Sequence, residues 1–348
     1  MSNIFPGYLT ERLPLVEQAL SRVAATPLDG TSCATADLSR YLYAPLAHFT
    51  SGGGKRVRPV LCLLGAEAVG AEPERALSAG IAIELFQSAA LIHDDIADES
   101  ELRRGEPCLY VTEGTGVAIN MGDLALTQVF EVVMEDAALD APTKLSLLRS
   151  LATMERHTLE GQALDLGWAR DGRWDITSAD YTFMVTSKTA YYTAAYPLYL
   201  GAIAGGASED VARELYAIGI EAGVAFQLQD DLLNLIGDAD AQGKDFRSDI
   251  TEGKRTLAVV HALENLGTAE RDELVSLLTA SVTAPDDLAR AVELIEAGGG
   301  IEHCRSLAEK GAKETKRLAA EAAEKGHITF EARDLLCSMA DFFVERAA

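Results

Sequence analysis

Positive charge is scarce in this chain, which has 30 lysine and arginine residues against 54 aspartate and glutamate residues among its 348 residues. The formal net charge is −24. So acidic a balance argues against nucleic acid or an anionic membrane surface as a general partner. Any phosphate-bearing ligand must therefore be held by a metal ion or by a local cluster of basic residues.

Several other signals are missing. The sequence has no CxxC motif and no Cys/His spacing, because its cysteines are few and scattered: Cys33, Cys62, Cys108, Cys304 and Cys337. This argues against structural zinc and a disulfide framework, and fits a reducing cytoplasm. The N-terminal residues MSNIFPGYLTERL lack the basic and apolar regions of a signal peptide, and no run approaches 18 uninterrupted apolar residues. We therefore predict a soluble cytoplasmic protein without a membrane span.

Strand signals are also largely missing, whereas helical periodicity extends along nearly the whole chain. Helices are predicted over residues 36–49, 57–70, 73–97, 117–139, 142–166, 178–204, 208–236, 254–266, 269–280, 285–296, 299–325 and 328–347. No Pro/Ser-rich linker and no short repeat divides the chain. The pattern therefore predicts an all-α protein, a single large helical bundle over residues 1–348.

Two aspartate clusters stand out, Asp94-Asp95-Ile96-Ala97-Asp98 and Asp230-Asp231-Leu232-Leu233-Asn234, each at the end of an apolar helical stretch. Carboxylates at positions i and i+4 share one helix face, where like charges repel and lose hydration. A hard divalent cation reverses this cost, because Mg2+ prefers carboxylate oxygens. The clusters therefore indicate metal ions that join the protein to a polyanionic substrate.

Basic residues lie close to the first cluster. Arg103 and Arg104 follow Asp98 after a short gap, a pattern that suits a diphosphate clamp and equally suits an acidic helix end paired with two arginines. Residues 52–59, GGGKRVRP, combine a backbone that can approach an anion with three cations, but are also typical of a basic surface turn. Their spacing is not that of a Walker A loop.

Taken together, these ordered motifs resemble those of the trans-polyprenyl diphosphate synthases, or polyprenyl synthetases, which build linear isoprenoid diphosphates. The resemblance extends from GGGKRVRP to SDITEGKRT and so covers most of the chain. It implies the isoprenoid synthase type fold, an all-α bundle around a deep central cavity, and a homodimer. It also implies that three Mg2+ ions bind the allylic diphosphate through the two aspartate motifs.

The resemblance assigns roles residue by residue. It implies metal binding by Asp94, Asp95, Asp98, Asp230 and Asp231, with Asp95 and Asp231 supporting their neighbours. It implies an isopentenyl diphosphate site at Lys55, Arg58, Gln87 and Arg104, and an allylic diphosphate site at Arg103, Lys188, Lys244 and Lys254. It implies that Lys188, Thr189 and Gln227 are catalytic, with Thr189 and Gln227 stabilising positive charge on the reacting carbons.

One position departs from the family's pattern. The second motif commonly ends in Asp, whereas this chain has Asn234. An amide oxygen can still accept a hydrogen bond from a metal-bound water. We therefore expect retuned metal binding and not inactivity.

Product length is expected to depend on the helix before Asp94. In the family, bulky side chains four and five residues before the first aspartate limit the product to fifteen carbons, and here those positions are Ala90 and Ala89. Phe86 lies one helical turn deeper, about 5.4 Å. We predict a product longer than farnesyl diphosphate. Geranylgeranyl diphosphate is the first expectation, and a product of twenty-five carbons or more is the alternative. The alternative is that both alanines only pack against a neighbouring helix.

The implied reaction is Mg2+-assisted ionisation of the allylic diphosphate, attack by the double bond of isopentenyl diphosphate, and proton loss. It needs no protein nucleophile, so we interpret His93 as structural. A class I terpene cyclase and a non-catalytic regulatory subunit of a heteromeric prenyltransferase are the alternatives. The cyclase needs no isopentenyl diphosphate site, and regulatory subunits tend to lose motif residues. The intact basic motifs favour chain elongation by a trans-prenyltransferase.

Overall fold

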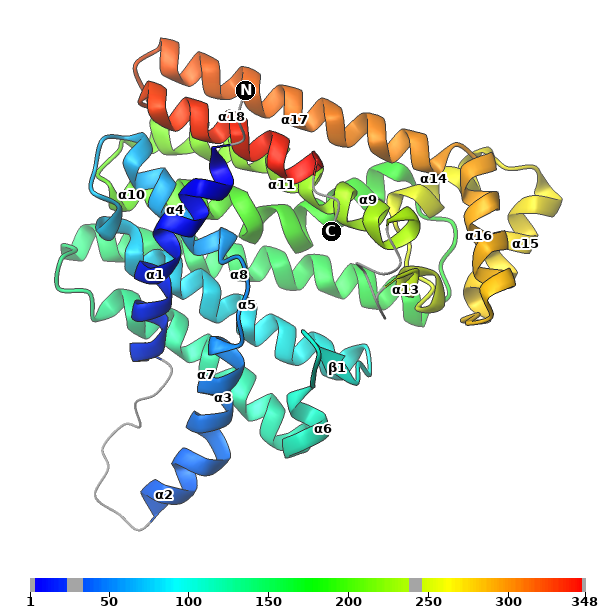
Figure 1. Cartoon of the computed structure of the whole chain (residues 1–348), viewed down its shortest axis with the longest axis horizontal. Helices are drawn as coiled ribbons and strands as arrows, with labels where there is room; N and C mark the ends of the chain where they lie inside the picture. Colours follow the sequence, from blue (N-terminus) through cyan, green and yellow to red (C-terminus); the bar gives the residue numbers. More distant parts are fainter. Residues whose placement is uncertain (1–3, 24–33, 238–245, 346–348) are drawn as a thin grey trace. The chain divides into compact units, whose positions relative to one another are not determined.

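The computed structural model in Figure 1 describes residues 4–23, 34–237 and 246–345, and these residues are mostly helical. The helices in chain order are α1 (Phe5–Val23), α2 (Ala34–Leu38), η1 (Ser39–Tyr43), α3 (Ala44–Ser51), α4 (Val57–Ala68), η2 (Pro73–Ala76), α5 (Leu77–Ala97), α6 (Leu109–Glu113), α7 (Thr115–Met134), α8 (Ala141–Arg170), α9 (Ser178–Val185), η3 (Thr186–Ala195), α10 (Tyr196–Ala204), α11 (Glu209–Ile236), α13 (Ser248–Thr251), α14 (Leu257–Asn265), α15 (Thr268–Thr279), α16 (Pro285–Ala297), α17 (Gly300–Glu324) and α18 (Phe330–Glu345). A short antiparallel hairpin joins β1 (Leu102–Arg103) to β2 (Glu106–Pro107). The predicted all-α class is confirmed.

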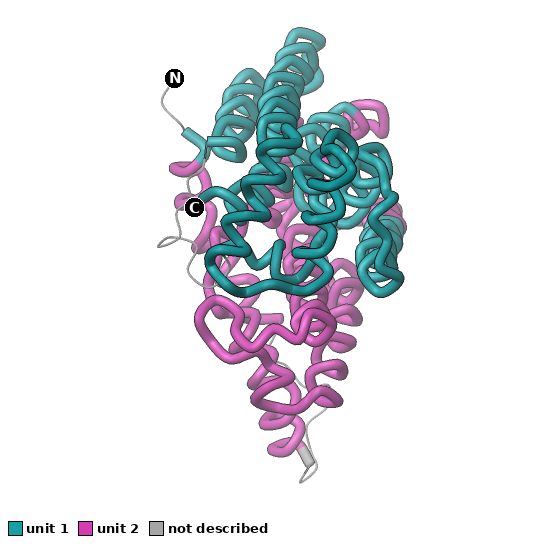
Figure 2. The backbone as a smooth tube through the Cα atoms, turned by 90° about the vertical axis from the view of Figure 1, so that its right-hand side faces the viewer, with its two compact units in different colours: residues 1–5, 153–196, 214–348 teal, residues 6–152, 197–213 magenta. Residues whose placement is uncertain are grey.

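The chain divides into two compact units, which Figure 2 shows in different colours. Unit 1 contains residues 1–5, 153–196 and 214–348, and unit 2 contains residues 6–152 and 197–213. The division passes through α8 after Ala152 and not through a linker. The prediction of a single domain stays a prediction.

The core of unit 2 is built around α5. This helix is rich in Ala, Ile and Leu, and most of its side chains are buried against neighbours that include α4 and α7. Gly122 on α7 allows the close approach, because a Cβ there would overlap the ring of His93 on α5. His93 thus packs between two helices, which supports its structural interpretation. Residues 73–97 and α7 are each long and apolar enough to cross a membrane, although most of the first segment is buried within the protein. The absence of a membrane span therefore remains a prediction.

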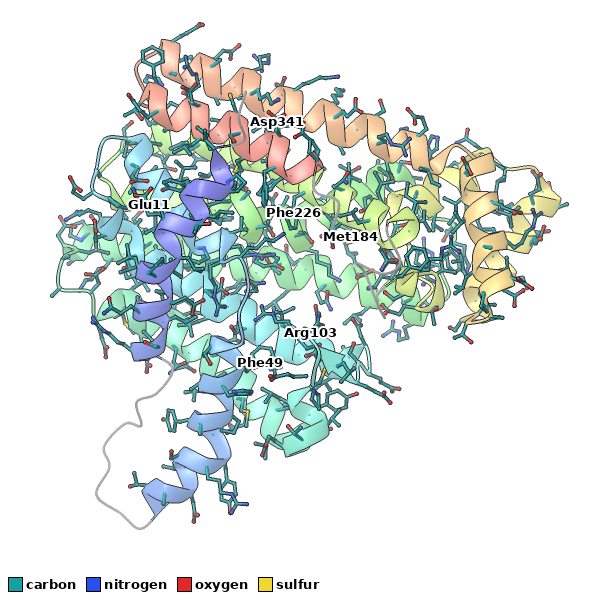
Figure 3. The ribbon with its side chains drawn as sticks, viewed as in Figure 1. Glu11, Phe49, Arg103, Met184, Phe226 and Asp341 are labelled. Atoms are coloured by element: carbon teal, nitrogen blue, oxygen red, sulfur yellow. The ribbon has the colours of Figure 1, made fainter. Side chains whose placement is uncertain are left out.

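Unit 1 contains the C-terminal helices. The long helices α17 and α18 pack side by side in Figure 1. Phe226 on α11, labelled in Figure 3, meets the ring of Phe343 on α18 with centroids 5.0 Å apart. A second apolar cluster joins α9 to the short helices α14, α15 and α16. The helix predicted over residues 178–204 is continuous but changes its hydrogen-bond pattern, because η3 is a π-helix between α9 and α10. π-helical segments are frequent at functional sites.

Candidate active site

The first aspartate cluster ends an accessible stripe of α5. Gln87, Ala90, Leu91 and Asp94 are half-buried, and Asp98, which caps the helix, is exposed. Their spacing places them on one face of the helix. Asp94 and Asp98 therefore present their carboxylates on the same face as Gln87 and Ala90.

Asp95 lies on a different face and is only 2% exposed. Its Oδ1 accepts a 2.8 Å hydrogen bond from Nε of Arg103 and a second one from Nη2 of the same guanidinium. Arg103 is on β1, the next element after α5, and is labelled in Figure 3. Asp95 therefore anchors the hairpin to α5, and Arg103 is held beside the first cluster.

The glycine-rich loop before α4 carries a buried cation in its centre. Arg56 adopts a left-handed conformation with φ of 46°, and its guanidinium donates to Glu17 at 2.7 Å, to Glu84 at 2.6 Å and to the carbonyl of Thr50 at 2.7 Å. This pairing fixes the loop from inside. Lys55 stays exposed and Arg58 half-buried on either side of it.

Arg104 joins the same loop. Its Nη1 donates to the carbonyl of Gly53 at 2.8 Å. Burial lowers the pKa of Arg104, and the positive charges of Arg56, Arg103 and Arg58 lower it further. The structure thus gathers cations and a glycine backbone in unit 2, an arrangement that suits a diphosphate group.

The second aspartate cluster lies near the end of α11 in unit 1. Asp230 is exposed, whereas Asp231 is 9% exposed. The carboxylate of Asp231 accepts hydrogen bonds from the hydroxyl of Tyr181 at 2.5 Å and from Nε2 of Gln227 at 2.8 Å. Burial, together with the nearby charge of Asp249, raises the pKa of Asp231 to about 7. Asp231 therefore orients Gln227 and is occupied by protein donors, and Asp230 is the accessible carboxylate.

The lysines predicted in the second half have different outcomes. Lys254 forms ion pairs with Asp249 at 3.3 Å and Glu252 at 2.7 Å. Lys244 lies outside the described residues. Lys188 is in η3, and its Nζ donates to the carboxylate of Asp165 on α8. Thr189, the next residue, is 7% exposed.

Asp165 was missed by the sequence analysis. The helices α8 and η3 approach closely at Gly161, where a Cβ would overlap the backbone nitrogen of Lys188. Asp165 follows one turn later on the same face of α8 and so reaches the lysine side chain. The available signal was a glycine four residues before a carboxylate within a long helix, GQALD.

The donor set fits Mg2+. The accessible carboxylates Asp94, Asp98 and Asp230 offer only oxygen ligands. Across the described ranges, no three metal-binding side chains gather into one group. Mg2+ is commonly held in this way, by one or two carboxylates, with waters and substrate phosphates completing its octahedral shell.

An all-helical protein with two such aspartate clusters and a basic glycine loop has the features of an enzyme that acts on prenyl diphosphates. Residues 39–295 match the Polyprenyl synthetase family, and the chain belongs to this family. It is accordingly a trans-prenyl diphosphate synthase, a prenyltransferase of isoprenoid biosynthesis, as the sequence predicted.

Relatives and solved structures agree with this assignment. The chain is 38% identical to the short chain isoprenyl diphosphate synthase of Methanothermobacter thermautotrophicus, over 86% of this chain and 88% of the relative. It resembles the geranylgeranyl pyrophosphate synthetase of Pyrococcus horikoshii with a TM-score of 0.87 and 30% identity, over 98% of both chains. A Corynebacterium glutamicum geranylgeranyl pyrophosphate synthase, solved with isoprenyl diphosphate and magnesium, has a TM-score of 0.81 at 28% identity over 99% of both chains. The predicted isoprenoid synthase fold is confirmed.

Proposed function

We propose that the protein condenses isopentenyl diphosphate with an allylic diphosphate to give geranylgeranyl diphosphate or a longer all-trans product. The observation that carries the length is Ala90, a small side chain on the accessible stripe of α5, one turn before Asp94. Phe86, one turn deeper in the helix, has a bulky side chain and is 2% exposed. Relatives of this chain include farnesyl, geranylgeranyl and geranylfarnesyl diphosphate synthases, so the family name alone does not determine product length.

The basic residues divide between the two substrates. Lys55, Arg58 and Arg104 bind the diphosphate of isopentenyl diphosphate, supported by the contact of Arg104 with Gly53, and Gln87 contributes from the same face of α5 as Asp94. Arg103, Lys188, Lys254 and Lys244 bind the allylic diphosphate.

Three Mg2+ ions, held by Asp94, Asp98 and Asp230, would supply positive charge to the departing diphosphate. The ammonium of Lys188 adds charge to the same group. Thr189 and the amide of Gln227, fixed by Asp231, orient dipoles toward the developing allylic cation. The departed diphosphate then accepts the proton lost from the product.

The two alanines of the predicted floor differ in their surroundings. Ala89 is fully buried in an apolar cluster with Ile92, Met121 and Ala125, so it packs against α7. Ala90 is half-buried on the stripe. We therefore assign the position that determines product length to Ala90 rather than to Ala89.

Incubation of the purified protein with Mg2+, isopentenyl diphosphate and, separately, dimethylallyl, geranyl and farnesyl diphosphates tests the activity. Dephosphorylated products are sized by chromatography and mass spectrometry. A linear alcohol of twenty or more carbons supports the proposal. Cyclic hydrocarbons formed without isopentenyl incorporation would identify a class I cyclase, and no turnover would indicate a regulatory subunit.

Matched variants test the length assignment. Ala90→Phe should shorten the product because it adds a ring to the stripe, and Phe86→Ala should lengthen it because it removes a ring one turn deeper in α5. Ala89→Phe should also shorten the product if its ring enters the cavity. If its ring instead disrupts the packing against α7, it lowers thermal stability with little change in length. Unchanged product length in both Ala90→Phe and Phe86→Ala would place the floor on another element.

We also propose that the enzyme acts as a cytoplasmic homodimer, without a membrane span or a nucleic-acid partner. Exposed apolar side chains on α7, Ile119 and Met134, support a subunit contact there. Sedimentation equilibrium of the wild type and an Ile119→Lys/Met134→Lys variant tests it. A mass of one chain for the wild type would reject the dimer.

A further inference from the structure

Asn234 occupies the place of the last carboxylate in the second aspartate cluster, four residues after Asp230 on α11. Its side chain is committed to the chain segment that begins α13. Oδ1 accepts a hydrogen bond from the backbone N–H of Asp249 at 3.2 Å, and Nδ2 donates to Oγ of Ser248 at 3.0 Å. The amide therefore binds protein groups on both of its ends.

The backbone of Asn234 holds the same turn. Its carbonyl accepts a 2.8 Å hydrogen bond from the N–H of Arg247, a residue with φ of 62°. Three hydrogen bonds from one residue thus fix Arg247, Ser248 and Asp249 against the end of α11. A turn fixed in this way has little freedom to move its side chains away from the aspartate cluster.

These contacts position Asp249, which has a carboxylate side chain. The side chain of Asp249 is 15% exposed and lies 3.3 Å from Nζ of Lys254. Burial raises the pKa of Asp249, Lys254 opposes that change, and the charges of Glu252 and Asp230 add to it. Asp249 also contributes to the raised pKa of Asp231. The end of α11 therefore has three interacting carboxylates even though position 234 is an amide.

The amide at position 234 is consistent with this arrangement. An aspartate there could accept the hydrogen bond from the N–H of Asp249, but it would place a fourth negative charge among Asp230, Asp231 and Asp249. Like charges at such short range repel strongly in a partly buried site. Asn234 keeps the hydrogen bonds without that repulsion.

We propose that Asp249 supplies the carboxylate that Asn234 lacks in the second cluster, and that Asn234 is the positioning residue that holds Asp249 there. This rests on the proposed function, because the ligand is Mg2+ together with a diphosphate. Asp230 would hold the ion directly, and Asp249 would accept hydrogen bonds from its waters, as an outer carboxylate does in metal sites.

Metal binding is measured directly with the full-length protein. Mn2+ replaces Mg2+ and is titrated with inorganic diphosphate present, while electron paramagnetic resonance follows free Mn2+. Asp249→Asn should weaken binding of one ion by about tenfold, the lower end of outer-ligand effects. Glu252→Gln is the matched control, since Glu252 pairs with the same Lys254, and it should bind within about twofold of the wild type. Equal affinity in Asp249→Asn and the wild type would overturn the proposal.

The variant Asn234→Asp tests the same proposal and does not depend on whether Asp249→Asn folds. If Asp249 already provides the missing carboxylate, Asn234→Asp should bind Mn2+ no more tightly than the wild type. Tenfold tighter binding would show that the cluster lacks a carboxylate and would contradict the proposal. In the double variant Asn234→Asp/Asp249→Asn, affinity should recover toward the wild type.

The two proposals fail differently. Wild-type protein that binds no Mn2+ with diphosphate would reject both the metal site and this inference. Wild-type protein that binds Mn2+ and elongates prenyl diphosphates, with Asp249→Asn binding equally well, would reject only the inference.

Discussion

The two aspartate clusters begin with the same Asp-Asp pair, but units 1 and 2 neutralise the second aspartate in different ways. In unit 2, Asp95 is paired with the guanidinium of Arg103. In unit 1, Asp231 accepts hydrogen bonds from neutral groups, Tyr181 and Gln227, and its pKa is raised to about 7 by burial and by Asp249. In both clusters the first aspartate is accessible and the second is an anchor. Each Asp-Asp pair therefore provides one candidate metal ligand, Asp94 or Asp230, and one structural carboxylate, Asp95 or Asp231.

The largest expected losses of kcat/KM distinguish the candidate metal ligands from the structural carboxylates. Asp94→Asn and Asp230→Asn should each lower kcat/KM by about a thousandfold, because each removes a charge that stabilises the leaving diphosphate. Asp95→Asn should cost about a hundredfold by releasing Arg103. Asp231→Asn should cost about tenfold, because an amide can still accept one of its two hydrogen bonds. Steady-state kinetics over a range of Mg2+ concentrations measure all four.

The Mg2+ dependence distinguishes the roles. The ligand variants should require more Mg2+ for half-maximal rate, whereas Asp95→Asn and Asp231→Asn should keep the wild-type requirement. Thermal melting without Mg2+ is the control for folding. Equal losses for all four variants would remove the distinction between ligand and anchor.

Helical periodicity was sufficient to predict the class of fold and the face of α5 that carries Gln87, Ala90 and Asp94, because these depend on neighbours along one helix. It could not identify Arg103 as the partner that makes Asp95 an anchor, since that depends on where the chain after α5 folds back. Arg56 was counted only as one of three loop cations, because its partners Glu17 and Glu84 are distant in sequence. Charge type can be read from a sequence, whereas charge pairing requires tertiary structure.

A second comparison concerns the cation–carboxylate pairs of the two units, Arg103 with Asp95 and Lys188 with Asp165. Asp165→Asn should raise KM for the allylic diphosphate by about ten- to a hundredfold, because it frees Lys188 from its position. KM for isopentenyl diphosphate should change little, since the residues proposed to bind it are in unit 2. Initial-rate kinetics with each substrate varied in turn measure both constants.

Glu160→Gln is the control, because Glu160 is an exposed residue of the same helix and its contacts with Arg156 and His157, both at 3.4 Å, are surface pairs of little energy. Gly161→Ala should reproduce the Asp165→Asn effect and lower stability as well, because the added Cβ would displace the backbone of Lys188. Equal rises in KM for both substrates in Asp165→Asn would show that the pair is merely structural.

The smallest expected effect compares two other carboxylates. Glu84 in unit 2 is buried, and its Oε1 is paired with Arg56. Among the described residues, Oε1 of Glu155 on α8 has no hydrogen-bond partner, as is also true of Oε2 of Glu84. Burial raises the pKa of Glu155 from 4.5 to about 7. Between these two pH values the folded chain holds a proton that the unfolded chain has lost. The free energy of unfolding therefore falls as pH rises through this range and levels off above pH 7.

Each pH unit in this window lowers the free energy of unfolding by about 1.4 kcal/mol when the group is fully buried. Because the side chain of Glu155 is only half-buried and retains some solvent, we expect the free energy of unfolding to fall by about 2 kcal/mol between pH 5 and pH 8. Glu155→Gln should remove this loss, because the amide does not titrate, and should therefore be more stable than the wild type at pH 8 and similar at pH 5. Urea denaturation at both pH values measures it, with Glu160→Gln expected to follow the wild type. If the stability of Glu155→Gln depended on pH as that of the wild type does, Glu155 would be solvated or paired in solution. The acid of unit 1 would then resemble Glu84 of unit 2, which is paired with Arg56.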